Sequence, residues 1–144
     1  MDYQLFDELE RTLEERQSLL HFDKILTDMA PERGIQQMLT QIVADEEQSL
    51  IALQRLYHSF MKQDYTFEDR PNPQIVEFED GVRARLLREI TAEQEYGDQF
   101  ARAVDATVRK LLFEQFCAAI SRVQRLLYVF ISTEKNNLRR SAGV

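Results

Sequence analysis

Residues 42–57, IVADEEQSLIALQRLY, decide the fold. Apolar residues recur in this stretch three and four positions apart, which is the spacing of one face of an α-helix. The same face also carries two polar residues, as its order shows: Ile42, Glu46, Ser49, Leu53. The stretch therefore predicts a long helix that packs against other helices and buries a carboxylate among leucines.

The composition of the whole chain agrees with a helical protein. Its 144 residues include only 4 glycines and 3 prolines, which is too few for a fold rich in turns, such as a β-sandwich or a barrel. The hydrophobic fraction of 44% and the charged fraction of 30% suit long amphipathic helices. We therefore expect a single all-α domain.

Four amphipathic segments cover most of the chain. We expect helices over residues 2–29, 31–62, 76–104 and 106–133, with Pro31 in the first turn of the second helix and Asp105 as the N-cap of the fourth. Residues 64–74, DYTFEDRPNPQ, contain two prolines and form the one long connection. This layout predicts a four-helix bundle over residues 1–134, made of two helical hairpins joined by a crossover, and a frayed polar tail at residues 135–144.

Composition also disfavours several classes of protein. With 18 basic and 25 acidic residues the net charge is −7, which opposes general binding to nucleic acid. No stretch is apolar for the length of a membrane span, so we expect no membrane partner and a cytoplasmic location. The single cysteine, Cys117, excludes an internal disulfide and is expected in the core as a small apolar residue.

Charged residues interrupt the apolar stripes of three segments. Arg16 and Asp23 lie among the leucines of the first segment, Glu46 lies in the second, and Glu93 lies in the third. A buried charge is costly unless it is paired, so we expect these residues to meet in the interior. Two alternatives stay open: each charge can tip toward solvent at the edge of its stripe, and a shifted register in the third segment can place Glu89 or Glu95 inward.

Residues 42–57 resemble the second helix of ferritin-like proteins of the rubrerythrin type. That family carries an Ile-Ala-x-Asp-Glu-x-x-His run followed by spaced leucines. Asp45 and Glu46 fit this run, Ser49 stands where the histidine would be, and Leu53 and Tyr57 continue the pattern. The resemblance implies a ferritin-like four-helix bundle.

The resemblance also implies where a di-iron site would lie. The family uses one Glu from each of two helices and a Glu-x-x-His pair from each of the other two. By position, Arg16 stands in place of the glutamate ligand of the first helix, and Ser49 stands in place of the histidine of the second. Glu46 and Glu93 match the glutamate ligands of the second and third helices. The two halves of the chain can be superposed with a shift of 77 or of 70 residues, which places Val123 and Leu126 or Phe116 and Ala119 at the ligand positions of the fourth helix. No ligand remains there in either alignment.

A degenerate di-iron site of this kind predicts an ion cluster in the core. Arg16 would supply the cation that holds Glu46 and Glu93 together, with Asp23 and Ser49 as further members. We then expect no cofactor and a non-catalytic role as an oligomeric interaction or stress-associated protein. The alternative is a rubrerythrin-like oxidoreductase or iron-binding protein with a remodelled site, whose ligands for iron or another divalent metal would be Glu46, Glu93 and His21.

The fourth segment has more apolar residues than one packed face needs. Residues 128–131, YVFI, are consecutive, and consecutive residues point around most of the circumference of a helix. At least one of them should lie outside the core and bind another surface. We therefore expect a homodimer, while the sequence names no other protein partner.

Overall fold

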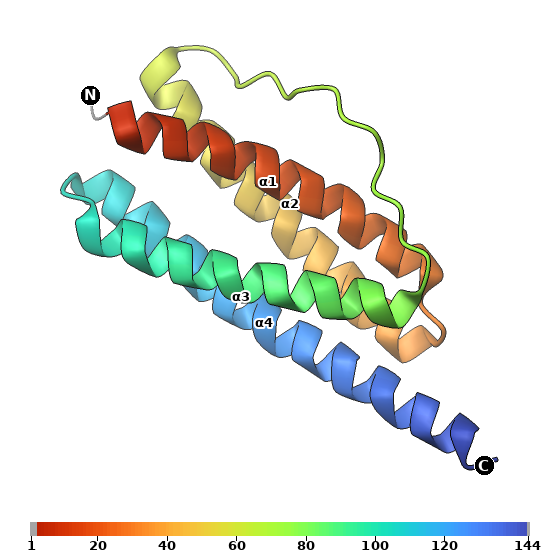
Figure 1. The fold of residues 1–144 in the computed structure, drawn as a ribbon. Helices are drawn as coiled ribbons and strands as arrows, with labels where there is room; N and C mark the ends of the chain where they lie inside the picture. Colours follow the sequence, from red (N-terminus) through yellow and green to blue (C-terminus); the bar gives the residue numbers. More distant parts are fainter. Residues whose placement is uncertain (1–2, 144) are drawn as a thin grey trace.

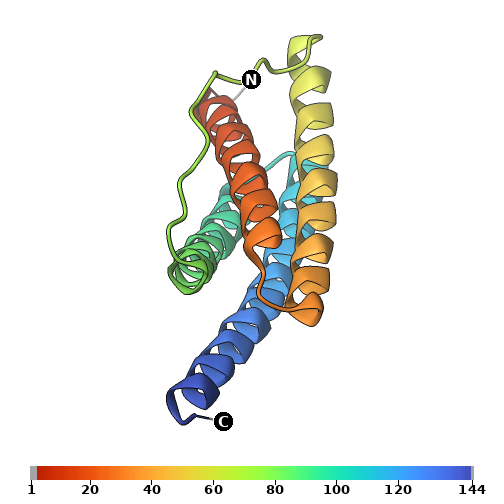
Figure 2. The same cartoon turned by 90° about the vertical axis from the view of Figure 1, so that its right-hand side faces the viewer.

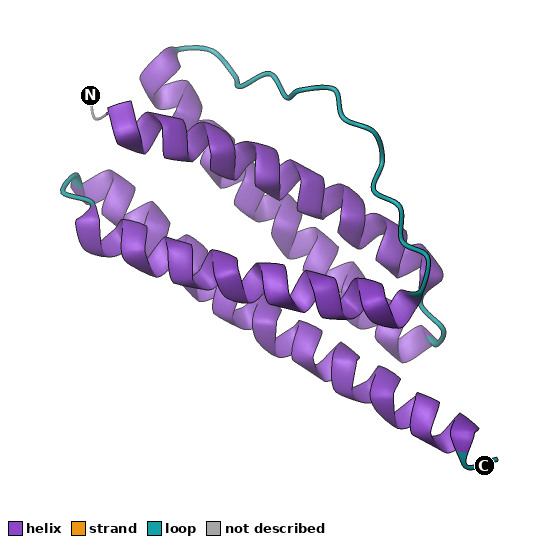
Figure 3. Cartoon of the chain, viewed as in Figure 1, coloured by secondary structure: helices purple, strands orange, loops and turns teal. Residues whose placement is uncertain are grey.

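A computed structural model describes residues 3–143 as a bundle of four α-helices (Figure 1). The helices are α1 (Tyr3–Met29), α2 (Arg33–Met61), α3 (Phe78–Arg102) and α4 (Ala106–Ser141). The described part of the chain contains no strand (Figure 3). None of the helices within it combines the length and apolar character that a membrane crossing requires. The prediction of an all-α four-helix bundle is confirmed.

The four helices form two antiparallel hairpins, α1 with α2 and α3 with α4 (Figures 1 and 2). Residues 62–77, which we call the crossover, run back along the bundle and join the two hairpins. Helix α1 also packs against α3, and α2 packs against α4. Each helix therefore has two antiparallel neighbours, which is the arrangement that the predicted hairpins and crossover require.

The helix ends refine the predicted boundaries. Asp105 is the N-cap of α4, and its side chain accepts a hydrogen bond from the backbone N–H of Val108 at 3.0 Å. Glu32 is the N-cap of α2, so Pro31 lies in the turn and not in the first helical position. Residues 1, 2 and 144, which belong to the predicted domain and tail, lie outside the described residues.

The predicted end of the fourth helix at residue 133 is wrong. Helix α4 continues to Ser141, so most of the expected frayed tail is helical. The extension has partners in other parts of the bundle, since Asn136 bonds to Glu32 and Asn137 bonds to Glu79. Arginines in the last turn also favour a helix end, because the helix dipole places negative charge there. As a result α4 is the longest helix and projects past the end of the bundle (Figure 2).

Side chains of the first hairpin hold the crossover in place. Gln54 of α2 donates to the backbone oxygen of Tyr65 at 3.0 Å and accepts from its backbone N–H at 2.9 Å. Glu14 of α1 accepts from the hydroxyl of Tyr65 and from the backbone N–H of Glu68, both at 2.8 Å. These four hydrogen bonds fix the first part of the crossover against α1 and α2.

The buried core consists of two apolar clusters separated along the bundle axis. One lies toward the α3–α4 turn and includes Leu9, Leu13, Leu53, Leu56, Tyr57, Ala92, Tyr96, Val108, Leu112 and Ala119. The other lies toward the α1–α2 turn and includes Leu26, Ile35, Leu39, Ile42, Val82, Leu86, Leu126 and Val129. Polar residues fill the level between the two clusters, and they form the candidate site described below.

One glycine marks the closest approach between the crossover and the bundle. A Cβ atom at Gly81 in α3 would lie 2.7 Å from Cγ2 of Ile75 and 2.8 Å from Cδ2 of the buried Leu26. The other mid-helix glycine of α3, Gly97, is different, because a Cβ there would lie 3.4 Å from the ring of Phe116. Only Gly81 therefore needs the absence of a side chain.

The two glycines should respond oppositely to the same substitution. Gly81→Ala should lower the free energy of unfolding by about 1–2 kcal/mol, because the clash exceeds the gain in helix propensity. Gly97→Ala should raise it by up to about 1 kcal/mol through propensity alone. Denaturant titration of both variants measures the difference, and a stabilised Gly81→Ala would show that the crossover does not pack tightly on α3.

Candidate functional site

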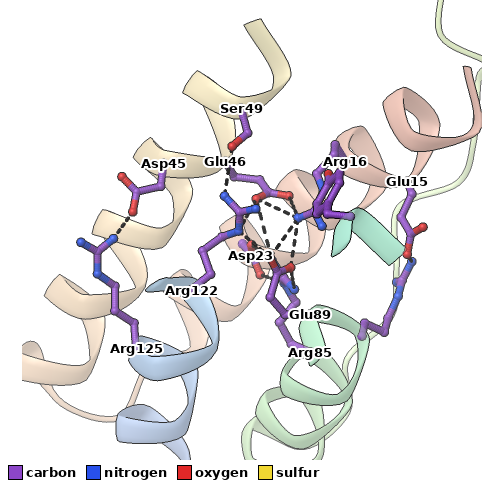
Figure 4. A network of polar contacts seen from close by, with 12 residues as sticks. Glu15, Arg16, Asp23, Asp45, Glu46, Ser49, Arg85, Glu89, Arg122 and Arg125 are labelled. Atoms are coloured by element: carbon purple, nitrogen blue, oxygen red, sulfur yellow. Dashed lines mark hydrogen bonds and ion pairs between the residues drawn. The ribbon is translucent and has the colours of Figure 1, made fainter. Parts of the chain in front are cut away.

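The candidate site is a layer of buried charged side chains between the two apolar clusters (Figure 4). All four helices contribute to it, and each of its six charged side chains is at most 1% exposed. We call these six residues the core ion cluster: Arg16, Asp23, Glu46, Arg85, Glu89 and Arg122. Ser49 and Tyr96 border the cluster.

Glu89 of α3 is the carboxylate with the most cationic partners. It accepts hydrogen bonds from Arg16 at 3.0 Å, from Arg85 at 2.8 Å and from Arg122 at 2.6 Å. Burial opposes the ionisation of Glu89, but the three guanidinium groups outweigh it and hold the pKa of this carboxyl well below its usual range. Glu89 is therefore ionised in the folded protein.

Glu46 of α2 shares two of these arginines with Glu89. Nη1 of Arg16 lies 2.9 Å from Oε1 of Glu46, and Nε of Arg122 lies 3.2 Å from its Oε2. Nη2 of Arg85 lies at 4.0 Å from the same Oε2. The carboxylates of Glu46 and Glu89 contact the same arginines and would repel each other without them. These arginines therefore allow both carboxylates to be buried.

Asp23 and Arg85 form the tightest two-point contact of the cluster. Nε and Nη2 of Arg85 donate to the two carboxylate oxygens of Asp23 at 2.7 and 3.2 Å, which is the forked geometry favoured by guanidinium and carboxylate. Burial raises the pKa of Asp23 to about 6, even though Arg85 favours its ionised form. Asp23 is thus the member of the cluster that titrates near neutral pH.

Arg16 and Arg85 remain charged despite their burial. Burial by itself lowers the pKa of a guanidinium, but the charges around Arg16 reverse this effect and raise its pKa well above the usual value. Asp23, Glu89 and Glu46 raise the pKa of Arg85 in the same way. The cluster therefore contains three positive charges, and they balance its three carboxylates when Asp23 is ionised.

Two neutral side chains accept further hydrogen bonds from the arginines of the cluster. The hydroxyl of Tyr96 accepts from Nε of Arg16 at 2.9 Å, and Oγ of Ser49 accepts from Nη1 of Arg122 at 3.0 Å. Among the described residues, two buried side-chain atoms lack a partner, Nη2 of Arg122 and Oε1 of Gln115. The cluster is therefore almost fully satisfied, which is the condition under which buried charges are tolerated.

The structure brings together four of the five residues predicted for the core cluster. Arg16, Asp23 and Glu46 meet in the interior, and Ser49 binds the cluster through Arg122. The prediction for Glu93 is wrong, because its side chain is half-buried and outside the cluster. Glu89 takes its place on α3.

The error at Glu93 arose from the wrong face of the third helix. The apolar stripe in which Glu93 was placed runs through Leu86, Ile90 and Phe100 to Val104, and Val104 follows α3 and is 92% exposed. The buried face of α3 is rotated from that stripe, because Arg85, Ala92 and Tyr96 point inward with Glu89. Two charged residues on the inward face of α3, which has few large apolar side chains, made that face hard to recognise.

Sequence reasoning also missed two of the three arginines. Arg85 precedes Glu89 by one helical turn, a spacing that favours an ion pair. Arg122 follows the helical spacing of its buried neighbours Ala119, Leu126 and Val129. Both signals were present, but long cationic side chains are seldom fully buried, so their spacing alone indicates solvent exposure more often than burial.

The residues proposed as alternative metal ligands are not gathered. His21 is exposed and contacts Gln17 at 3.4 Å, while Glu93 lies outside the cluster that holds Glu46. Within residues 3–143 no three His, Cys, Asp or Glu side chains are placed to hold a metal ion. The carboxylates that do converge already bind guanidinium groups, and those positive charges oppose a divalent cation. The donor set therefore does not fit a di-iron centre.

Comparison of the chain with models of known protein families, with curated proteins and with solved structures finds no match.

The inward position of Glu89 can be tested against that of Glu93. Glu89→Gln should lower the free energy of unfolding by about 3–5 kcal/mol, because it leaves three buried arginines with two carboxylates. Glu93→Gln makes the same chemical change on the same helix and should alter stability by less than about 0.5 kcal/mol. Urea titration provides the measurement, and equal losses would contradict the assigned orientation of α3.

Asp23 should make stability depend on pH. Because burial raises its pKa from the ordinary value of 3.8 to about 6, the folded state binds more protons than the unfolded state between these values. Its contribution is therefore fully present below about pH 4 and is lost as the pH rises through 6. Relative to Asp23→Asn, the wild type should lose about 2–3 kcal/mol between pH 4 and pH 7.

Urea titrations of wild type and Asp23→Asn at several pH values measure this difference. The arginines hold the pKa of Glu89 well below its usual range, so this carboxyl stays ionised between pH 4 and pH 7 and its titration does not contribute to the difference. A difference that rises with pH would mean that Arg85 outweighs burial and lowers the pKa of Asp23.

Proposed function

We propose that this chain is a non-catalytic, ferritin-like bundle protein that acts by binding protein surfaces. In this proposal the core ion cluster takes the place that a di-iron centre has in the ferritin-like family. The observation that carries the proposal is the pairing of every buried carboxylate in the layer with a buried arginine.

The chemistry of the interior supports a structural role for the cluster. Catalysis by carboxylates needs a group that can exchange protons or ligands with a substrate, and that group must be reachable. Glu46 and Glu89 are 0% exposed and are held by two and three arginines at 3.3 Å or less. Side chains in this position act on the stability and uniqueness of the bundle more readily than on a substrate.

The surface supports a role in binding. Several large apolar side chains are exposed on α4, among them Phe113 at 52%, Tyr128 at 57% and Leu138 at 68%. Exposed apolar residues that cluster on one element are typical of surfaces that bind other proteins. The external face of the bundle thus offers more for recognition than its interior offers for chemistry.

Iron loading tests the proposal against the metal-binding alternative. Wild-type protein loaded with ferrous iron in air and then desalted should retain no iron above the level of a protein-free control. Its thermal midpoint should also be unchanged, because an ion bound to the folded state would raise it. About two retained irons per chain with a raised midpoint would overturn the proposal.

Two substitutions serve as matched controls for this measurement. Glu93→Gln and His21→Gln each remove one of the alternative ligands while leaving the core ion cluster intact. Both should show the same iron content and midpoint as the wild type. Loss of bound iron in either variant would assign that residue to a metal site and contradict a non-catalytic role.

A further inference from the structure

Helix α4 has a second stripe on the face that points away from the core. Its positions alternate four and three residues apart, which is the spacing of a coiled-coil seam. We call this stripe the outer seam: Phe113, Cys117, Ile120, Gln124, Leu127, Ile131, Glu134 and Leu138. Four of its large apolar side chains are between 44% and 68% exposed, and Cys117, predicted in the core, is exposed as well.

The outer seam shares no residue with the inward stripe of α4, although two of its members also touch α3: Phe113 lies against Phe100, and Glu134 pairs with Arg83. The inward stripe has the same alternation and consists of Val108, Leu112, Gln115, Ala119, Arg122, Leu126, Val129 and Thr133. At 100° per residue, the centres of the two stripes lie roughly 140° apart around the helix. A helix that packs on one bundle needs one such stripe, so the second indicates another helix as partner.

The outer seam is complementary to itself when two copies run antiparallel. A coiled-coil seam alternates two kinds of position, a and d, and in an antiparallel pair each a position lies opposite a d position of the partner. A two-fold axis that crosses the seams at the height of Arg122 satisfies this rule over the whole stripe. Apolar residues then face apolar residues: Ile131 opposite Phe113, Leu127 opposite Cys117, and Leu138 opposite Ala106. Near the axis, Gln124 faces Ile120.

Charge agrees with this alignment. The same two-fold arrangement places the exposed Lys110 opposite Glu134, whose side chain is 38% exposed and touches Arg83 at 3.7 Å. The contact occurs twice, once at each end of the seam. Shifting the alignment by one heptad in either direction removes this pairing and places Leu127 opposite Lys110 or Glu134 opposite Cys117. Only one antiparallel alignment therefore matches both apolar residues and charges.

The length of α4 fits the same alignment. Residues 106–138 span about 50 Å, and the part of α4 that projects past the bundle would lie beside the first turns of the partner's α4 (Figure 2). The exposed Leu138 belongs to this projecting part. An antiparallel partner therefore covers the apolar end of α4 that this copy of the bundle leaves open.

We propose that two copies of the chain associate through the outer seams of α4. The two helices run antiparallel, and the two-fold axis crosses the seams at the height of Arg122, between Ile120 and Gln124. The proposal deepens the proposed function, because it names a second copy as the bound protein surface. It rests on residues outside the core ion cluster, so the two can fail separately.

Sedimentation of the full chain at tens of micromolar should show a dimer. Leu127→Glu places one new negative charge per copy in the apolar part of the interface, opposite the partner's Cys117, and should raise the dissociation constant at least about tenfold. Ile51→Glu is the matched control, because Ile51 on α2 has the same exposure of 44% and lies outside the seam. A monomeric wild type, or equal weakening by both substitutions, would overturn the proposal.

The single cysteine makes the orientation testable. In the proposed alignment Cys117 lies about 15 Å along the axis from its counterpart and opposite Leu127. Mild oxidation should therefore cross-link the Leu127→Cys variant into a covalent dimer, but not the wild type. Leu138→Cys is the control, because its new thiol lies on the seam but about 16 Å from the partner's cysteine along the axis.

The outcomes separate the two proposals. Cross-linking of the wild type through Cys117 indicates a parallel pair and overturns the antiparallel dimer. A monomer that retains no iron overturns the dimer and leaves a non-catalytic role intact. A cross-linked Leu127→Cys dimer whose wild-type form binds two irons supports the dimer and overturns the proposed function.

Discussion

The balance of three guanidinium groups and three carboxylates in the middle of the bundle is the constraint on which the rest of the structure depends. Each charge is costly to bury alone, and each is tolerable because the others stand within hydrogen-bond distance. The members come from all four helices, so the helices must meet at the right height and with the right faces inward. Apolar clusters on either side then exclude water and strengthen the ion pairs.

A polar layer of this kind makes the bundle selective about its own arrangement. Leucine faces can pack in several alignments with little loss, whereas a shift of α3 by one turn would separate Glu89 from Arg16 of α1 and Arg122 of α4. The polar layer therefore specifies one alignment of the helices, while the apolar clusters contribute most of the stability of the folded state. The same ion pairs engage the buried carboxylates that a catalytic or metal site in the core would need. This supports the proposal that the protein acts through its surface.

Much of this arrangement could be predicted from the sequence, and the failures have physical causes. The low glycine and proline content and the spacing around Glu46 indicated the bundle and one buried carboxylate. Arg16 was recognised because leucines flank it on both sides at helical spacing. Arg85 was missed, and Glu89 was only an alternative to Glu93, because α3 has few large apolar residues to define its inward face. Partners in other helices decide such a position, and they lie far away in the chain.

The anchoring of the crossover has a consequence for how the two halves of the chain find each other. Gln54 and Glu14 hold residues 65–68 against the first hairpin, which shortens the free part of the connection to the second hairpin. A shorter tether raises the effective concentration of one half of the molecule around the other. It also limits how far one hairpin can extend to exchange with the hairpin of a neighbouring chain. The hydrogen bonds of the crossover thus favour packing of the two hairpins within one molecule over domain swapping between two.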